Sequence, residues 1–294
     1  MDSRLYLPKL QGLQEPPLTI LDYLVLRFPH IDAQSWWDRA ARGLIRFEDG
    51  TVLTRDTPYS HGRTVYYARE VFDEPGVEES EIVIFRDENI LVADKPRGMV
   101  VTPAGNHLQR SLLVRLREAT GLPDLTPMHR LDRETAGLVL FAIQEESRPL
   151  YHRLFAKNLV EREYRAVCHL EGPVTQRNWK VANRMEPGEP WFRQRIALED
   201  GRVNSVTRIE LKVCKGKLGI FVLWPETGKK HQLRVHMASI GFPIVGDLLY
   251  PSFRQAENGD PPLQLLAYRL AFVDPVSGEK RDFRSMRSLE TGEL

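Results

Sequence analysis

The spacing of hydrophobic and polar residues divides the chain into segments with helical and with strand periods. Between residues 18 and 48, apolar residues recur at helical spacing in two stretches separated by Pro29, which predicts two short helices. Ile45–Thr54, interrupted by the turn pair Asp49-Gly50, and Thr64–Phe72 follow a strand pattern. The first part of the chain is therefore predicted to form two helices and a small sheet.

A second pattern begins after residues 74–80, whose Pro, Gly and charge content is typical of a linker. Strands are predicted at 82–85, 89–94, 159–170, 206–213, 218–224 and 263–272, and helices at 111–120, 146–158 and after the turn at 228. Residues 171–204 are predicted to form a long excursion, and the final dozen residues to be frayed. Because several strands are linked as hairpins, the pattern favours an α+β fold with a mixed, largely antiparallel sheet.

Length and composition agree with two domains, predicted at residues 1–75 and 81–294. A chain of 294 residues exceeds the usual size of one domain, and its charged fraction of 28% is typical of a soluble globular protein. The two cysteines, Cys168 and Cys214, form no Cys-x-x-Cys pair, which argues against a disulfide framework or a zinc site. The first residues show no basic segment followed by an apolar one, and no apolar run could span a bilayer. We expect a cytoplasmic protein without membrane association.

The charge is distributed unevenly along the chain, although the net charge is only +1. Residues 1–75 hold 9 Lys+Arg and 11 Asp+Glu, a difference of −2, whereas residues 193–234 hold 10 Lys+Arg and 4 Asp+Glu, a difference of +6. A footprint for nucleic acid would therefore lie in the later part of the chain. A solvated basic face would explain the same charges.

The stretch Met128–Ile143 combines a strand pattern with a cluster of polar residues. Its second half is a short apolar run, which favours a buried strand, and its first half carries four charged or ionisable side chains, His129, Arg130, Asp132 and Arg133. Polar groups at the mouth of a core strand stand on a rigid base, as catalytic groups require. An ordinary turn in which Asp132 bonds local backbone is the alternative.

Three motifs carry a resemblance to a known family. His-Arg-Leu-Asp followed by Glu-Thr-x-Gly-Leu and an apolar strand resembles the signature of the RluA-type pseudouridine synthases. The turn Lys95-Pro96-Arg97-Gly98 and the segment Lys230–His236 are similar to two further motifs of that family. The resemblance covers about residues 82–274. It implies a pseudouridine synthase fold, with a central mixed, largely antiparallel sheet flanked by helices, that isomerises uridines in ribosomal or transfer RNA without cofactor or metal.

The first 75 residues resemble a degenerate S4 domain, a small RNA-binding α+β module. They depart from that pattern because they are net acidic and the second helix is not rich in lysine. A role in packing or positioning therefore stands beside RNA binding as an interpretation.

The resemblance also implies roles for individual residues. Asp132 would be the catalytic carboxylate, acting on the ribose as nucleophile or base. A cationic partner keeps such a group ionised, and the resemblance assigns that pairing to Arg234. Tyr164, in Glu-Tyr-x-Ala, would stack on the uracil and help to move a proton. Ala136 stands where the family often has serine, a difference that removes one local hydroxyl and no catalytic group.

Five residues are expected to contact RNA: Arg130, Lys229, Lys230, His231 and Gln232. By resemblance, Arg130 fills the space left by a flipped base, since extruding a base costs a few kcal/mol of stacking and pairing. A salt bridge from Arg130 to Glu134 is the alternative. The lysines precede a predicted helix N-terminus, where backbone N–H groups favour phosphate. The histidines 129, 231 and 236 do not have the spacing of a metal site and are interpreted as a hydrogen-bonding scaffold.

Two other functions are alternatives to this interpretation. An RNA-binding or ribosome-assembly factor could use the same fold without catalysis, but it would need no Asp132–Arg234 pair. A hydrolase that releases the base would generally need two carboxylates around the bond, and one is apparent. We expect a monomeric isomerase that acts on RNA.

Overall fold

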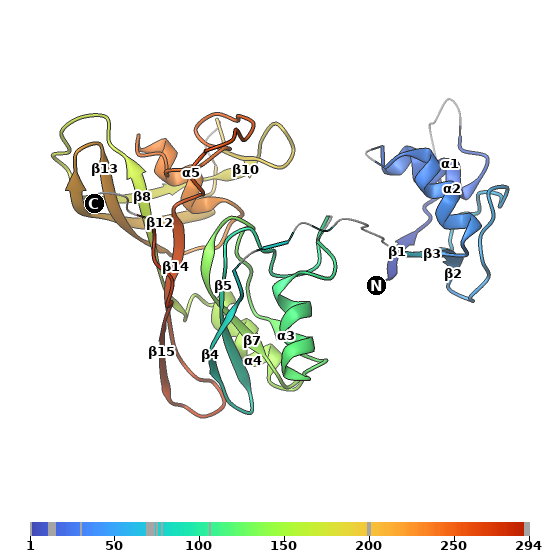
Figure 1. Ribbon diagram of the computed structural model, residues 1–294, viewed down its shortest axis with the longest axis horizontal. Coiled ribbons are helices and arrows are strands. Elements are labelled where there is room, and N and C mark those ends of the chain that lie inside the picture. The colour runs from blue at the N-terminus through green and yellow to red at the C-terminus, as the bar shows by residue number, and fades with distance from the viewer. Residues whose placement is uncertain are drawn as a thin grey trace. The chain divides into compact units, whose positions relative to one another are not determined.

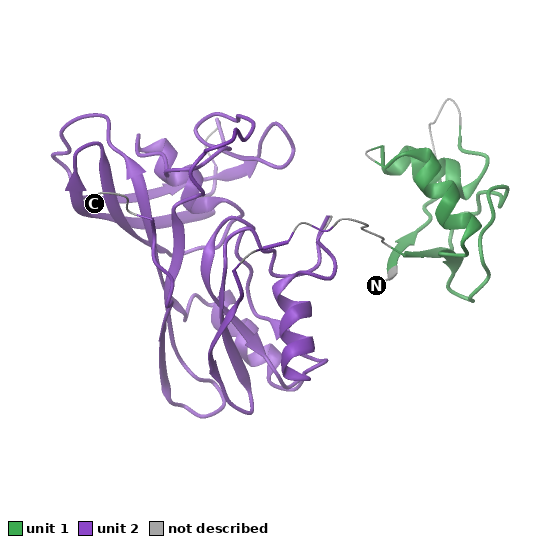
Figure 2. Cartoon of the chain, viewed as in Figure 1, with its two compact units in different colours: residues 1–73 green, residues 74–294 purple. Residues whose placement is uncertain are grey.

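The computed structural model divides the chain into two compact units, residues 1–73 and 74–294 (Figure 2). It describes residues 2–10, 16–29, 31–68, 74, 76–77, 79–105, 107–198 and 201–290. Parts of the predicted linker at 74–80 and of the predicted strand at 64–72 lie outside the described residues.

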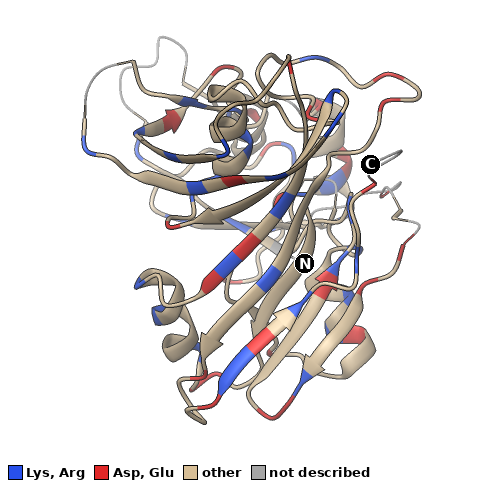
Figure 3. Ribbon diagram, turned by 90° about the vertical axis from the view of Figure 1, so that its left-hand side faces the viewer, with Lys and Arg blue, Asp and Glu red and all other residues tan. Residues whose placement is uncertain are grey.

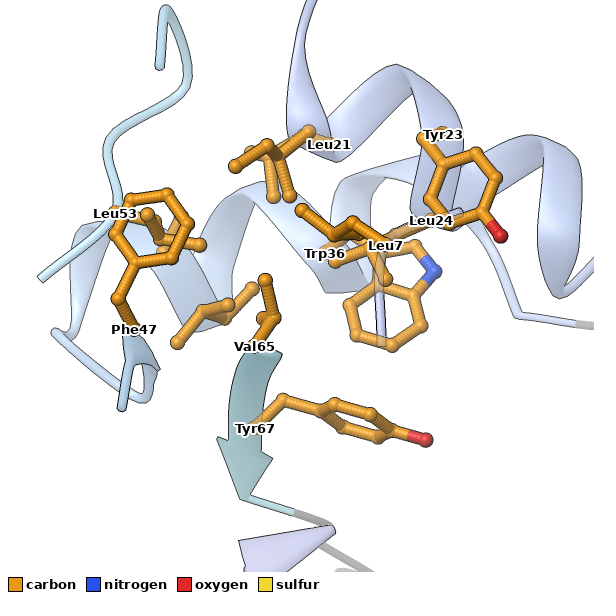
Figure 4. Close-up of a cluster of buried hydrophobic side chains, with 12 residues drawn as sticks. Leu7, Leu21, Tyr23, Leu24, Trp36, Phe47, Leu53, Val65 and Tyr67 are labelled. Atoms are coloured by element: carbon orange, nitrogen blue, oxygen red, sulfur yellow. The ribbon is translucent and has the colours of Figure 1, made fainter. Parts of the chain in front are cut away.

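The smaller unit packs two helices on a three-stranded antiparallel sheet of order β1-β3-β2 (Figure 1). Its elements are β1 (Asp2–Tyr6), α1 (Ile20–Arg27), α2 (Ala33–Ala41), β2 (Ile45–Phe47) and β3 (Thr64–Ala68). The two predicted helices are confirmed, and Thr19 and Asp22 form a reciprocal capping box at the start of α1. Trp36 is fully buried among side chains of both layers, including Leu7, Val65 and Tyr67 (Figure 4). β1 was not predicted, because its five residues show too little alternation of apolar and polar residue types to indicate a strand.

The larger unit is built on a ten-stranded sheet with the order β4-β5-β7-β14-β8-β13-β12-β9. Two more strands complete the sheet beside this row of eight: β15 pairs with β14, and β6 pairs with β7. Among the described strands, β7 and β14 pair in parallel and the other neighbours are antiparallel. The predicted α+β class with a mixed, largely antiparallel sheet is confirmed. The elements are β4 (Ile82–Arg86), β5 (Ile90–Lys95), α3 (Leu112–Thr120), β6 (Thr126–Pro127), β7 (Ala136–Ala142), α4 (Arg148–Ala156), β8 (Glu161–His169), β9 (Asn178–Asn183), β10 (Met185–Pro187), β11 (Gln194–Ile196), β12 (Ser205–Lys215), β13 (Leu218–Pro225), α5 (Gln232–Ser239), β14 (Leu265–Val273) and β15 (Lys280–Arg284).

The unbroken apolar sequence of β7 follows from cover on both of its faces. Alternate side chains of β5 and β7, such as Val92 and Leu140, pack with α4, and the intervening ones, such as Leu91 and Phe141, pack with α3. β7 is therefore buried along its whole length and gives a rigid base to the polar loop before it.

Gly137 lies where β7 meets β14, and this position requires glycine. Its φ of +116° lies in a region that residues with a side chain rarely adopt, and an added Cβ would lie 2.3 Å from the carbonyl oxygen of Ala267. Glycine thus allows the parallel pairing of Ala136 with Leu266, which joins the two halves of the sheet.

Two predictions for the second half of the chain are wrong. Residues 171–204 include β9, at the edge of the main sheet, and the β10–β11 hairpin. The end of the chain is ordered as far as it is described, because β15 pairs with β14 and the buried carboxylate of Asp94 accepts hydrogen bonds from Ser285 and Met286. The sequence of β15, Lys-Arg-Asp-Phe-Arg, hides this strand because Phe283 is its one buried side chain.

Candidate active site

The loop 128–135 is anchored on both sides before it enters β7. The imidazole of His129 accepts a hydrogen bond at Nε2 from the backbone N–H of Leu140, 3.1 Å away, and stacks on Phe155. The fully buried ammonium of Lys95 donates to the carbonyl oxygen of Arg133 at 3.0 Å, as well as to those of Pro96 and Met99. The loop is thereby tied both to β7 and to the turn after β5.

Burial keeps His129 neutral and weakens the preference of Lys95 for its charged form. It lowers the pKa of His129 to about 3 and that of Lys95 to about 7. A neutral imidazole can act as the acceptor that the contact with Leu140 requires. Both side chains support the loop through hydrogen bonds to the backbone.

The loop borders a cavity of about 610 Å³, large enough for a nucleotide. The lining of the cavity includes three segments that are remote in the sequence: the loop 129–135, the first half of β8 and residues 225–234. Asp132, Tyr164 and Arg234 contribute to its wall, one from each segment.

Asp132 faces two nitrogen groups of the third segment. Its Oδ2 lies 4.0 Å from Nη1 of Arg234, and its Oδ1 lies 3.9 Å from Nε2 of His231. The Asp132 side chain is 29% exposed, whereas those of Arg234 and His231 are 6% and 8% exposed. The carboxylate is thus open to the cavity while its cationic neighbour is held in the protein.

The closest partner of Arg234 is Asp247, a residue that the sequence motifs do not identify. Asp247 accepts from Nε at 2.8 Å and from Nη2 at 2.6 Å, and both side chains are buried. Asp247 also accepts the backbone N–H groups of Leu249 and Tyr250. Burial acts to lower the pKa of Arg234, but the hydrogen bonds and charge of Asp247 outweigh it and the pKa is raised.

His231 is held by Tyr250, three residues after Asp247. Its Nδ1 lies 2.9 Å from the hydroxyl of Tyr250, and this hydroxyl accepts the backbone N–H of Gln194 at 2.8 Å. The φ of His231 is +56°, a left-handed conformation at the start of α5. Burial lowers the pKa of His231, partly opposed by the charge of Asp132, so the imidazole is neutral at pH 7.

Tyr164 approaches the cavity from β8, where it pairs with Leu223 on one side and Ala267 on the other. Burial raises the pKa of its phenol, and the charge of Asp132 acts in the same direction. Tyr164 therefore keeps its O–H proton at neutral pH and presents both a ring and a donor to the cavity.

The loop 227–231 is organised by Gln232. The side-chain oxygen of Gln232 accepts from the Thr227 hydroxyl and the Lys229 N–H, while its amide nitrogen donates to Val206 and Thr207. The side chain is 4% exposed. Gln232, expected to contact RNA, has its hydrogen-bonding groups occupied by protein atoms and shapes the loop that presents the exposed Lys229 and Lys230.

Arg130 is exposed at the rim of the cavity. The alternative partner considered for it, Glu134, instead pairs with Arg133, whose Nε lies 2.7 Å from its carboxylate. The Glu134 carboxylate thus has Arg133 as its partner, and Arg130 is part of the cavity lining.

The basic segment 193–234 is partly neutralised within the sheet. Arg208 pairs with Glu226 and Lys212 with Glu210. Figure 3 shows that basic and acidic positions are interleaved along strands of the larger unit in general. A uniformly basic strand face is thus absent from the described part of this segment. The exposed lysines 229 and 230 stand at the cavity instead.

His236 belongs to the scaffold below the site. Its ring nitrogens contact the hydroxyls of Thr207 and Ser205, and burial lowers its pKa to about 4.

Within the described ranges, no group of three or more His, Cys, Asp or Glu is placed to hold a metal ion. None of the helices that the structure describes is long and apolar enough to cross a membrane.

Comparison with known proteins decides the family. Residues 89–239 match the family model for RNA pseudouridylate synthase. The dual-specificity RNA pseudouridine synthase RluA of Vibrio cholerae is 36% identical over 198 residues, covering 66% of this chain and 78% of that protein. The chain belongs to the RluA family of RNA pseudouridine synthases. It is an isomerase whose substrate is RNA.

Two further relatives extend this similarity. The ribosomal large subunit pseudouridine synthase D of Zymomonas mobilis is 31% identical, covering 68% of this synthase and 67% of the relative. An uncharacterized RNA pseudouridine synthase of Synechocystis is 28% identical over 86% of this chain and 89% of its own. The human RNA pseudouridylate synthase domain containing 1 has the same fold, with a TM-score of 0.59 and 23% identity over 73% of this chain and 86% of that one.

The synthase also contains site residues that sequence reasoning missed. Asp247 and Tyr250 position Arg234 and His231, yet they lie in Ile-Val-Gly-Asp-Leu-Leu-Tyr, a segment with no cluster of polar residues to mark it. The glycine before Asp247, Gly246, is the one residue of this segment whose type points to a constrained position. Its φ is +75°, and a Cβ there would lie 2.4 Å from the carbonyl oxygen of Pro262.

Proposed function

We propose that this synthase converts specific uridines of ribosomal or transfer RNA to pseudouridine with Asp132 as its essential carboxylate. The observation that carries the proposal is the placement of that carboxylate, open to a nucleotide-sized cavity and 4.0 Å from the guanidinium of Arg234. A nearby cation favours the ionised form of an acid, which is the form that acts as nucleophile or base.

The reaction exchanges one bond of the nucleotide for another. The bond from the ribose C1′ to N1 of uracil breaks, the base turns, and a bond from C1′ to C5 forms. C5 loses a proton and N1 gains one, so the product is an isomer of the substrate. Asp132 acts on the ribose in the first step, and the cavity retains the uracil until it rejoins the sugar.

The remaining groups bind and orient the nucleotide. Tyr164 stacks on the uracil and its phenol exchanges a proton late in the reaction. Arg130 enters the space from which the uridine is extruded. Lys229 and Lys230 bind phosphate beside α5, and His231 lines the cavity next to Asp132. Gln232 contributes by holding this loop in place.

The class of target rests on the named activities of the relatives. One relative is a dual-specificity enzyme and another acts on the large ribosomal subunit, as their names state. We assign the smaller unit to an S4-like domain, supported by its two helices and its small antiparallel sheet. Its acidic balance favours a role in positioning the enzyme over direct RNA binding. The uridine is to be found by mapping pseudouridine at single-nucleotide resolution in RNA from cells with and without the gene.

The role of Asp132 is tested with Asp132→Asn. This variant should bind RNA with unchanged affinity and form no pseudouridine, because the amide can neither attack nor deprotonate the sugar. Asp124→Asn, an exposed position just before β6, is the matched control and should retain full activity.

Three results would contradict the proposal. If Asp132→Asn isomerised uridine at the normal rate, the carboxylate would not be essential. If the wild-type enzyme released free uracil as its main product, the site would be hydrolytic. Rescue of a gene deletion by Asp132→Asn would favour a non-catalytic role in RNA binding or ribosome assembly.

A further inference from the structure

An exposed group of aromatic side chains lies at the tip of the β10–β11 hairpin. Trp191 is 83% exposed and its ring centroid lies 5.8 Å from that of Phe192. Phe192 in turn lies 5.5 Å from Phe253, which is 47% exposed. We call Trp191, Phe192 and Phe253 the aromatic platform. A contiguous group of exposed apolar side chains is a feature of interaction sites.

The platform is held by the same residues that organise the active site. The backbone N–H of Gln194 donates to the hydroxyl of Tyr250, which contacts His231, and Arg193 donates to the carbonyl oxygen of Pro251 at 2.8 Å. The base of the hairpin also packs on α5, because Met185 and Val235 share one buried cluster (Figure 1). The hairpin that carries the platform is therefore attached to His231 and to α5, which supply part of the cavity wall.

Positive charge lies next to the exposed ring. The ammonium of Lys230 lies 6.0 Å from the centroid of Trp191, and Lys230 also lines the cavity that contains Asp132. An aromatic face beside a cation suits a nucleotide, since the ring stacks on the base while the cation attracts the phosphate. A protein partner would explain the exposed rings but not their position beside an RNA cavity.

We propose that the aromatic platform is an RNA subsite that stacks an unpaired base flanking the uridine in the cavity, with Lys230 on the adjoining phosphate. This inference rests on the proposed position of the RNA at Asp132. Stacking on an aromatic ring tolerates any base but requires one that is free of its duplex partner. The subsite thus selects uridines in loops or single strands over uridines within a helix.

The test is a comparison of RNA binding by wild type, Trp191→Ala and Trp191→Phe, measured by fluorescence anisotropy. The probes are a labelled hairpin whose loop is oligouridine and a labelled duplex of the same composition. Loss of one base–aromatic stack predicts about a tenfold rise in Kd of Trp191→Ala for the loop and less than about a twofold change for the duplex. Trp191→Phe, which keeps a ring, should bind nearly as the wild type does.

Val273→Ala is the matched control, since Val273 is a 53% exposed apolar residue of the same unit. It lies at the opposite end of β14 from Leu265, which lines the cavity, a separation of about 26 Å along an extended strand. Lys230→Gln serves as a second comparison. It should lower the slope of log Kd against log salt by about 0.7, whereas Trp191→Ala should leave that slope unchanged.

The outcomes separate this inference from the proposed function. An unchanged Kd of Trp191→Ala for the loop, or an equal loss for loop and duplex, would overturn the subsite. So would a change in oligomeric state on sedimentation without a change in RNA affinity, since the platform would then contact another copy of the chain. An active Asp132→Asn together with a weakened Trp191→Ala would instead refute the catalytic role and leave the subsite standing.

Discussion

Asp247 holds Arg234 by two nitrogens, Nε at 2.8 Å and Nη2 at 2.6 Å, and the third nitrogen, Nη1, is left 4.0 Å from Asp132. One guanidinium therefore serves two carboxylates, a buried one that fixes it and a cavity-facing one that it attracts. The planar fork of arginine permits this division, whereas a lysine ammonium would not.

Replacing Asp247 with asparagine should reduce both activity and stability. Arg234 would lose its charged partner in a buried place, which costs on the order of 3–5 kcal/mol, and its third nitrogen would no longer be aimed at Asp132. We expect the free energy of unfolding to fall by about 3 kcal/mol and kcat to fall more than tenfold at saturating RNA. Urea denaturation and single-turnover assays measure the two effects.

The control for Asp247 is Asp260→Asn. Asp260 makes a similar two-nitrogen contact with Arg254, but on the surface, where an ion pair contributes about 0–1 kcal/mol. Equal effects of the two substitutions would show that the burial of Asp247 is unimportant.

Gly137→Ala should be among the most damaging small substitutions in the chain. The added Cβ would collide with the backbone of Ala267 at 2.3 Å, and the φ of +116° would be strained, so a loss above about 4 kcal/mol or a failure to fold is expected. Gly216→Ala, also at positive φ but with nothing within 4 Å of the new Cβ, should lose only about 1 kcal/mol. Equilibrium unfolding in urea compares them, and similar losses would refute the close approach at Gly137.

Stability should fall as the pH drops from about 6.5 to about 4, in part because of His236. Burial lowers its folded pKa to about 4, so in this window the unfolded chain binds a proton at His236 and the folded chain does not. The difference favours unfolding at low pH by up to about 3 kcal/mol and vanishes above pH 6.5. Unfolding free energies measured across this range should show a shallower slope for His236→Gln, and an identical slope would contradict the assignment.

The two lysines of the active-site loop should dominate the salt dependence of RNA binding. Lys229→Gln combined with Lys230→Gln should lower the slope of log Kd against log salt by about 1.4, the value for two phosphate contacts on single-stranded RNA. The matched pair Arg4→Gln with Lys9→Gln removes two exposed charges from the smaller unit and should change the slope little, because that unit is assigned to positioning. A larger effect of Arg4 and Lys9 would make the smaller unit the main electrostatic contact with RNA.

Local sequence was sufficient for the elements that have a strong period of their own. The uninterrupted apolar run of β7 and the capped helices α1 and α3 could be predicted because burial and capping are determined by neighbouring residues. The motifs around Asp132 and Arg234 also identified the family. β1 and β15 could not be predicted in this way, since a short strand with few buried side chains depends on the partner that supplies its hydrogen bonds.

Distances across the fold required the tertiary structure. The sequence by itself determined the α+β class, the family and the identity of the cavity-facing carboxylate candidate. Only the folded chain decided that Asp247 orients Arg234, that Tyr250 contacts His231, and that Trp191 lies beside Lys230, which lines the cavity. The physical reason is that such contacts join residues brought together by sheet order and helix packing, and no local period records which distant side chains will meet.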